Sequence, residues 1–238
     1  MPTHPIHIVR TFLALAAIVP GLVIGVVIQL FTGDRRRATN RSLDLWGRWG
    51  TRAAGIRLEV EHSERLENAR PAVFIMNHRS GIDPILACAL LRRDIFAVVK
   101  HEFRHNVLLG PAFAFAGVVF VRRDKPREAA RTLEPAVAAI RAGRSLAITP
   151  EGTRHATSIL GPFKKGAFQI AMAAGVPVIP IVVANAEDVL PRRGWIMRPA
   201  TVRVSVLEPT STRHWTADTL EREIEVIRRA FEARLASL

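Results

Sequence analysis

The sequence AVFIMNHRSGIDP, residues 72–84, decides the fold because it joins a buried strand to a polar turn and then to a helix. Ala72 to Met76 form an unbroken apolar run, which is typical of a strand that is buried on both faces. Gly81 allows a tight turn, and Asp83-Pro84 predicts the N-cap and first residue of a helix. A strand, a tight turn and a helix in this order favour an α/β domain with a largely parallel sheet flanked by helices.

The same stretch places a histidine and a carboxylate, His78 and Asp83, at the exit of the strand, with four residues between them. Such a pair can act in catalysis. The neutral imidazole takes a proton from a hydroxyl, while the carboxylate orients the ring and stabilises the imidazolium. The structural alternative is that Asp83 only caps the helix and that His78 only forms a hydrogen bond. Taken alone, the stretch leaves both interpretations open.

A second polar stretch, PEGTR at residues 150–154, follows another strand-like segment, Ser145 to Thr149. Gly152 lets the backbone approach a ligand closely, and the guanidinium of Arg154 suits phosphate oxygens. The alternative is a Glu/Arg pair in a surface loop. Together, however, the two stretches supply a base and an anion-binding group at the same edge of a sheet.

Four blocks of sequence, in order, resemble those of the glycerolphosphate acyltransferase family, and in particular the 1-acyl-sn-glycerol-3-phosphate acyltransferases. His78 and Asp83 match its His-x4-Asp motif, and Gly117–Arg123 is similar to its second block. Glu151–Arg154 matches the third block, and Val176–Pro180 the fourth. The resemblance spans most of the chain.

The resemblance implies transfer of a fatty acyl group from acyl-CoA or acyl carrier protein to 1-acyl-sn-glycerol 3-phosphate, giving phosphatidic acid. His78 is then the general base and Asp83 its orienting partner. It implies no cofactor or metal besides the thioester co-substrate. The residues that it assigns to substrate binding are Arg123, Glu151, Gly152, Thr153, Arg154, Lys100 and Lys165.

Two departures from the family pattern bear on the acceptor. Gly81-Ile82 stands where many relatives carry bulky residues, and Thr149 stands where phenylalanine is frequent. Alternative acceptors are therefore glycerol 3-phosphate, another lysophospholipid or a glycolipid. The length of the acyl chain, the donor of hydrogen bonds to the oxyanion and the oligomeric state stay open.

A different chemistry is suggested by HEFRH, residues 101–105, which matches the His-Glu-x-x-His pattern of zinc peptidases. Its context opposes that interpretation, because the pentapeptide follows a strand directly and Gly110-Pro111 soon interrupts the run. The zinc peptidase stays as a distant alternative, beside a non-catalytic protein that binds acidic membranes.

The composition predicts a single catalytic domain with an appendage. The chain has 238 residues, of which 49% are hydrophobic, and a formal charge of +13 that favours an anionic partner. The lack of Tyr and of basic stretches interleaved with aromatic residues disfavours nucleic acid. A single cysteine, Cys88, excludes an intramolecular disulfide and fits a reducing compartment. Because Cys88 lies in an apolar run, we expect its side chain to be a small buried one.

Residues 1–54 are predicted to form a membrane anchor with interfacial helices, and residues 55–238 the acyltransferase domain. Thr11 to Phe31 are uncharged and apolar, and Pro20-Gly21 and Gly25 interrupt a segment that either spans the bilayer or dips into one leaflet. The basic residues that follow, Arg35–Arg37 with Arg41 and Arg48, outnumber Arg10. This bias predicts a cell-membrane protein whose catalytic domain lies on the cytoplasmic face, against anionic lipid.

The body is predicted to alternate strands and helices. Ser42–Ala54 forms a helix whose Trp46 and Trp49 serve either core packing or, as we favour, a membrane interface. The expected strands are 56–60, 72–76, 95–99, 118–121, 146–149, 178–183 and 202–206. The other expected helices are 84–91, 106–116, 124–143 with a bend at Pro135, and 217–235.

Overall fold

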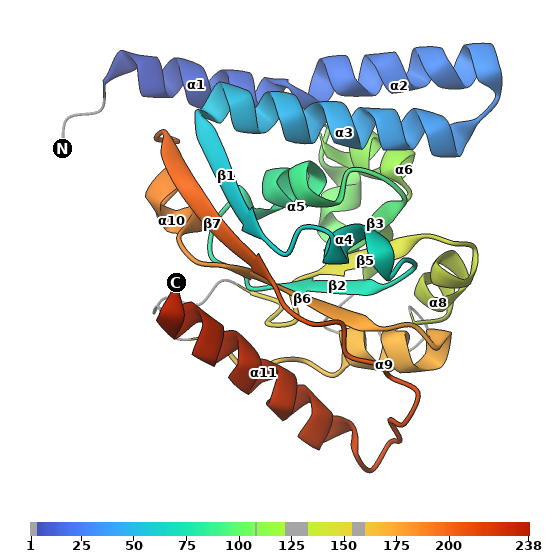
Figure 1. Ribbon diagram of the computed structural model, residues 1–238. Coiled ribbons are helices and arrows are strands. Elements are labelled where there is room, and N and C mark those ends of the chain that lie inside the picture. The colour runs from blue at the N-terminus through green and yellow to red at the C-terminus, as the bar shows by residue number, and fades with distance from the viewer. Residues whose placement is uncertain (1–3, 108, 122–132, 154–159) are drawn as a thin grey trace. The chain divides into compact units, whose positions relative to one another are not determined.

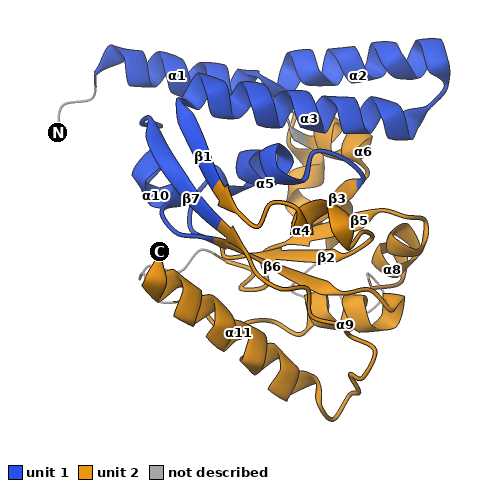
Figure 2. Ribbon diagram, viewed as in Figure 1, with its two compact units in different colours: residues 1–59, 79–94, 183–204 blue, residues 60–78, 95–182, 205–238 orange. Residues whose placement is uncertain are grey.

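The computed structural model describes residues 4–107, 109–121, 133–153 and 160–238 (Figure 1). These residues form two compact units, each assembled from segments that are distant in the sequence (Figure 2). Unit 1 comprises Met1–Glu59, Arg79–Asp94 and Val183–Val204. Unit 2 comprises Val60–His78, Ile95–Val182 and Ser205–Leu238. The boundary between residues 54 and 55 stays a prediction.

The fold is α/β, with a seven-stranded sheet in the order β1-β7-β6-β2-β5-β3-β4. The neighbours β2 and β5, β2 and β6, β3 and β5, and β3 and β4 are parallel, so the predicted, largely parallel sheet is confirmed. The strands are β1 Ile56–Glu61, β2 Val73–Met76, β3 Ile95–Lys100, β4 Val119–Val121, β5 Ser145–Ile148, β6 Val178–Val183 and β7 Ala200–Val206. Each lies within two residues of a predicted strand.

Strands β6 and β7 are antiparallel neighbours. Ala184 N–H donates to Arg203 O, and Leu207 N–H donates to Pro180 O. Residue numbers therefore rise along β6 as they fall along β7. Every residue of β6 is buried, as is every residue of β2, which explains why both segments are almost wholly apolar.

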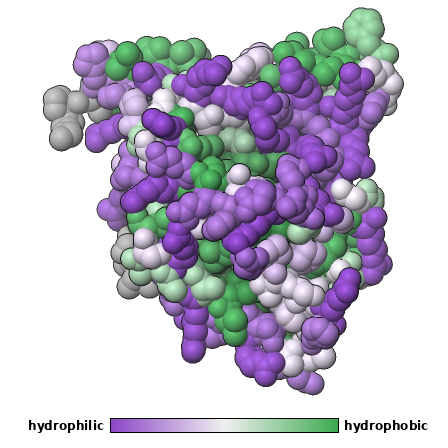
Figure 3. Space-filling model, viewed as in Figure 1, coloured by the Kyte–Doolittle hydropathy of each residue, from purple (hydrophilic) through white to green (hydrophobic). Residues whose placement is uncertain are grey.

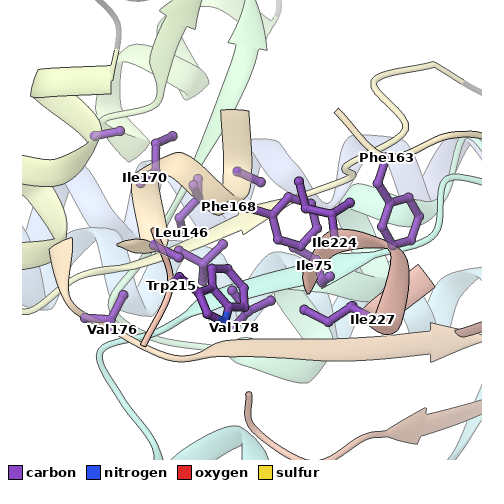
Figure 4. Close-up of a cluster of buried hydrophobic side chains, with 14 of the residues drawn as sticks. Ile75, Leu146, Phe163, Phe168, Ile170, Val176, Val178, Trp215, Ile224 and Ile227 are labelled. Carbon is purple, nitrogen blue, oxygen red and sulfur yellow. The ribbon is translucent and has the colours of Figure 1, made fainter. Parts of the chain in front are cut away.

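The core of unit 2 is formed by side chains from its strands and from three helices, and Figure 4 shows part of this cluster. These helices are α8 Leu133–Arg141, α9 Gly166–Ala174 and α11 Leu220–Ser237. Helix α11 corresponds to the predicted helix 217–235, and its buried residues, Leu220, Ile224, Ile227 and Phe231, share one helical face. The ring of Phe163 packs edge-on against Phe231, with 5.3 Å between the ring centres.

Unit 1 is built on three long helices, α1 Pro5–Ala16, α2 Ile18–Thr32 and α3 Arg35–Ala54. Gly33, in the left-handed region at φ 69°, ends α2, and Asp34 caps α3 by accepting a hydrogen bond of 2.9 Å from Arg37 N–H. The chain reverses at this point, so α3 runs back along α2 and α1 (Figure 1). Helix α3 also packs on α5, Asp83–Leu91.

Helices α1 and α2 present a face of small residues to α3. Ala14, Gly21 and Gly25 are buried, and a Cβ at Gly21 would lie 3.1 Å from Ser42 O. The two glycines therefore allow close helix packing instead of kinking a span. Apolar side chains cover the opposite, exposed side of α1 and α2, among them Phe12, Leu30 and Phe31 (Figure 3).

Pro5–Thr32 is the one helical stretch, among the residues that the structure describes, that is long and apolar enough to cross a bilayer. Its exposed apolar side is consistent with membrane association. Trp46 and Trp49 are half-buried, and their interfacial role stays a prediction.

Several local predictions differ from the structure. Helix α3 begins at Arg35, not Ser42, because Asp34 caps it there. The predicted N-cap of α5 is wrong: the helix begins at Asp83, after Ile82, and no side chain caps it. The predicted opening of a helix at Asp124 lies outside the described residues. Among the elements that the structure describes, four short ones have no counterpart among the predicted helices: α4 Arg65–Asn68, α9, α10 Ala186–Val189 and the 3₁₀ helix η1 His101–His105.

Candidate active site

The turn that follows β2 folds the carboxylate of Asp83 back over its own backbone. Oδ2 of Asp83 accepts hydrogen bonds from Arg79 N–H at 3.0 Å and from Ser80 N–H at 3.1 Å. Asp83 is 3% exposed, so its charge is stabilised by these amides and little by bulk water. The N–H of Arg79 belongs to the peptide bond that joins His78 to Arg79, so the carboxylate binds the main chain at the residue that directly follows the histidine.

The side chains of the turn fix it within unit 1. The hydroxyl of Ser80, which is fully buried, donates to Leu190 O at 2.7 Å. The guanidinium of Arg79 pairs with Glu187 of α10 at 2.5 Å. Both contacts join the turn to residues 187–190, in and just after α10, which limits its movement.

In unit 2, the carboxylate of Glu151 joins the first and third motifs. Oε1 accepts a hydrogen bond of 2.7 Å from His78 N–H, and Oε2 accepts one of 3.0 Å from Gly161 N–H. Glu151 is 4% exposed. With both oxygens bound to backbone amides, this side chain positions the backbone of His78.

The sheet explains how these motifs meet. Strands β2 and β5 are parallel neighbours, with Ile75 opposite Ile148. Their carboxyl ends therefore lie at the same edge, and His78 and Glu151 follow those ends by two and three residues. The predicted juxtaposition of the two motifs is correct in this respect.

The side chain and backbone of Lys164 lie beside the loop that carries Glu151. Gly152 has φ +71°, and a Cβ built there would lie 3.0 Å from Nζ of Lys164. Lys164 N–H also donates to Pro150 O at 2.9 Å. The loop therefore has an exposed ammonium group beside its glycine, which the sequence analysis did not assign to the site.

The neighbouring Lys165, which the resemblance assigned to the substrate, is occupied elsewhere. Its ammonium forms an ion pair with Glu221 of α11, and this hydrogen bond lowers the pKa of the Glu221 carboxyl. The two adjacent lysines thus point to different partners. A doubled Lys-Lys in the sequence gives no sign of which one faces the loop, because that depends on where α9 begins.

The other predicted substrate residues follow the carboxyl ends of strands. Thr153 is exposed in the loop after β5. Lys100 is the last residue of β3, a parallel neighbour of β5. Arg123 follows β4 by two residues, and both it and Arg154 lie outside the described residues.

Arg144 is a further residue that the sequence analysis missed. Its guanidinium donates to Ile95 O and Ala116 O, both at 2.8 Å, and to Gly117 O at 3.3 Å. It also lies over the ring of Phe96, at 5.1 Å. Arg144 thereby joins the start of β3 to the turn that opens the second motif, and an isolated arginine before a strand carries no sequence signal for such a role.

The zinc-peptidase pattern at residues 101–105 does not lie on a long α-helix, as its context after a strand predicts. His101 and His105 lie on a 3₁₀ helix of five residues, with 5.7 Å between their ring centres. Within the described ranges, no group of three or more His, Cys, Asp or Glu side chains is arranged to hold a metal ion. Cys88 is buried, which raises the pKa of its thiol to about 12 and makes it a poor nucleophile.

The acyltransferase family profile matches residues 57–184, which is more than half of the chain and includes the turn after β2 and the loop after β5. The chain belongs to the acyltransferase family. It is 30% identical over 177 residues to the 1-acyl-sn-glycerol-3-phosphate acyltransferase of Saccharomyces cerevisiae, covering 73% of this chain and 58% of that protein. It is 31% identical to the human 1-acyl-sn-glycerol-3-phosphate acyltransferase beta, covering 74% and 64%.

The chain thus spans about six tenths of the length of these curated relatives. A solved structure, the 1-acyl-sn-glycerophosphate (LPA) acyltransferase PlsC of Thermotoga maritima, matches the fold with a TM-score of 0.79. The match covers 96% of this chain and 94% of that one, at 24% identity. The match extends over nearly the full length of both chains and shows that the fold is a known one.

Proposed function

We propose that the protein transfers a fatty acyl group from acyl-CoA or acyl carrier protein to the free hydroxyl of 1-acyl-sn-glycerol 3-phosphate, giving phosphatidic acid. The observation that carries this proposal is the hydrogen bond between His78 N–H and Glu151, which holds the first and third family motifs together. The relatives that bear this activity by name share the stretch that contains both motifs.

In the proposed reaction His78 is the general base and Asp83 its partner. The ring takes the proton of the acceptor hydroxyl as its oxygen attacks the thioester carbonyl. The tetrahedral intermediate then collapses, the carbon–sulfur bond breaks, and the imidazolium returns the proton to the leaving thiolate. Asp83, folded back against the amides of residues 79 and 80, orients the ring and stabilises its charged form.

The acceptor's phosphate is proposed to bind beside the loop after β5. Gly152 keeps the backbone open, and the ammonium of Lys164 lies beside it. Lys164 is added to the proposed set on this ground, and Lys165, whose ammonium pairs with Glu221 at the surface, stays in it by family resemblance. Arg123, Arg154, Lys100 and Thr153 complete the proposed binding set by family resemblance, and Glu151 acts on the histidine's backbone instead of on substrate.

The proposed location is the cell membrane, with the catalytic residues on the cytoplasmic face. The exposed apolar side of α1 and α2 supports insertion into one leaflet. The arginines of α3 support a position against anionic lipid, since phosphate groups attract them.

The test is acyl transfer by purified protein in phospholipid vesicles, with acyl-CoA and acyl carrier protein as separate donors and lysophosphatidic acid as acceptor. His78→Ala is expected to lower the rate by about 10²–10⁴-fold while the protein stays on the vesicles. His214→Ala, which alters an exposed histidine of unit 2, is the matched control. Transfer that survives His78→Ala but is lost with a chelator and with His101→Ala would instead favour a metal site at residues 101–105.

A further inference from the structure

An exposed loop of unit 1 combines an aromatic ring with two positive charges. Residues 191–198, PRRGWIMR, connect α10 to β7, and Trp195 is 68% exposed. Arg192 and Arg193 are exposed beside it, and no acidic residue occurs between Val189 and Leu207. Burial of this exposed indole against a partner would remove a large apolar surface from water, so a partner that covers the ring would be stabilised by it.

The base of this loop is held firmly. Arg198 N–H donates to Val189 O at 2.8 Å, and Gly194 N–H donates to Pro191 O at 2.8 Å. Ile196 and Met197, which directly follow the exposed tryptophan, are 9% and 1% exposed. The loop therefore presents its tip, Arg192 to Trp195, from a fixed base.

A buried hydrogen bond ties the loop to the apolar N-terminal helix. Met197 N–H donates to Oγ1 of Thr11 at 2.7 Å, and the same hydroxyl donates to His7 O at 2.7 Å. Near Thr11 on α1, the apolar side chains of Ile8, Phe12 and Leu15 are 43%, 71% and 52% exposed. The loop thus adjoins the helix whose outer side is proposed to enter the membrane.

We propose that the tip of loop 191–198 is a second membrane contact, with the ring of Trp195 in the headgroup layer and Arg192 and Arg193 on anionic lipid phosphates. Tryptophan rings favour this layer, where one edge is apolar and the other wet, and arginines bind phosphates there. The loop and α1 then form one continuous surface with a single partner, the lipid bilayer. This inference rests on the proposed membrane-bound function.

The test uses the fluorescence of Trp195 in vesicles whose phospholipids carry brominated acyl chains. The signal of Trp195 is the difference between wild type and Trp195→Phe, with Trp215→Phe, which alters a buried ring of unit 2, as the control. We expect brominated chains to quench the Trp195 signal at least twofold and to leave the Trp215 signal unquenched. A Trp195 signal that brominated chains quench less than twofold would overturn the proposal.

The role of the two arginines is tested by the double variant Arg192→Gln/Arg193→Gln. In vesicles with phosphatidylglycerol, each lost charge is expected to weaken insertion of the tip about fivefold. Arg213→Gln, an exposed arginine of unit 2, is the matched control and should change nothing. Equal quenching in the double variant and the wild type would show that the arginines do not contact lipid.

Acyl transfer measured on the same vesicles separates this inference from the proposed function. If wild type transfers acyl groups while Trp195 stays in water, the second contact is wrong and the function stands. If Trp195 is quenched but no thioester donor supports transfer, the membrane contact stands and the proposed function is wrong.

Discussion

The backbone N–H of His78 donates a hydrogen bond to Oε1 of Glu151, across 2.7 Å. The second oxygen of that carboxylate accepts from Gly161 N–H. The glutamate of the third motif therefore acts on the main chain that carries the proposed base. Its bond to His78 connects the exits of the parallel strands β2 and β5, and its bond to Gly161 holds a later part of the chain after β5, so displacement of this side chain would disturb both segments at once.

Glu151→Gln is the sharpest test of that role. An amide fits the same space but offers one acceptor oxygen, so one of the two backbone N–H groups then faces an NH₂ donor. Loss of one hydrogen bond to a buried amide is expected to lower the free energy of unfolding by about 1–3 kcal/mol. We also expect a lower kcat, measured alongside denaturant unfolding.

Glu208→Gln provides the comparison. Glu208 is exposed and pairs with Arg65 at the surface, so its loss is expected to cost about 0–1 kcal/mol. If the Glu151→Gln variant has the same free energy of unfolding and the same kcat as the Glu208→Gln variant, the Glu151 carboxylate does not position His78.

Asp83→Asn separates the orienting role of the carboxylate from its structural one. The amide oxygen can still accept from Arg79 and Ser80 N–H, so the turn should persist and the melting temperature should change little. The negative charge that stabilises an imidazolium is lost, and kcat should fall about 10²–10⁴-fold with little change in KM. A variant that retains wild-type kcat would exclude Asp83 as the partner of His78.

The strands were predictable because a parallel sheet that is buried on both faces demands unbroken apolar runs, as in Val73–Met76 and Val178–Val183. The His78 and Glu151 motifs were predictable because they follow such runs directly. Helix α9 was not, because its sequence GAFQIAMAA is apolar all round and shows no helical period. The pairing of Lys165 with Glu221 and the three carbonyls around Arg144 depend on segments far apart in the chain, so no local pattern announces them.

Arg144→Lys tests whether that arginine supports the second motif. A lysine keeps the charge but lacks the guanidinium's fork of N–H donors, so it cannot keep the hydrogen bonds to the carbonyls of Gly117, Ile95 and Ala116 together. We expect a raised KM for lysophosphatidic acid, because the second motif carries Arg123, with a smaller change in kcat. Steady-state kinetics measure both constants.

Arg141→Lys is the matched control for this arginine. Arg141 makes an exposed hydrogen bond of 2.8 Å to Ala173 O, and its replacement should leave KM unchanged. If the Arg144→Lys enzyme has the KM of wild type, Arg144 does not position the second motif.

Asp94 predicts a specific dependence of stability on pH. The hydrogen bond from the Arg36 guanidinium lowers the pKa of the Asp94 carboxyl below its ordinary value, and a bond from Asn40 adds to this. Because the pKa of Asp94 is lower in the folded protein than in the unfolded chain, the charged carboxylate stabilises the fold fully above about pH 4, the pKa in the unfolded chain. This stabilisation is lost as the pH falls through the pKa of the folded state.

Asp94→Asn should therefore lower the melting temperature at pH 7, and the gap from wild type should narrow below about pH 4. Asparagine tolerates the positive φ of 52° at this position, so the backbone need not change. Asp218→Asn, at an exposed position, should show no such gap. A gap of constant size from pH 7 to pH 3 would mean that the Asp94 charge does not stabilise the fold.

Gly47→Ala tests the close contact between α3 and α5, the helix that begins with Asp83. A Cβ at Gly47 would lie 2.4 Å from Ala89 N and 2.6 Å from Cys88 C, and backbone atoms cannot move aside as a side chain can. The helices must separate, which is expected to cost about 1–3 kcal/mol of unfolding free energy. Because α5 moves with Asp83, kcat should fall as well.

Gly166→Ala is the counterpart at the start of α9, where nothing lies within 4 Å of the added methyl group. That substitution should stabilise the protein by about 0.4–1 kcal/mol, because alanine has less freedom than glycine in the unfolded chain. Denaturant unfolding measures the change in unfolding free energy of both variants, with acyl transfer measured in parallel. If α3 and α5 meet through Gly47, this change is negative for Gly47→Ala and positive for Gly166→Ala. A Gly47→Ala protein as stable as wild type would mean that the two helices pack with more space between them.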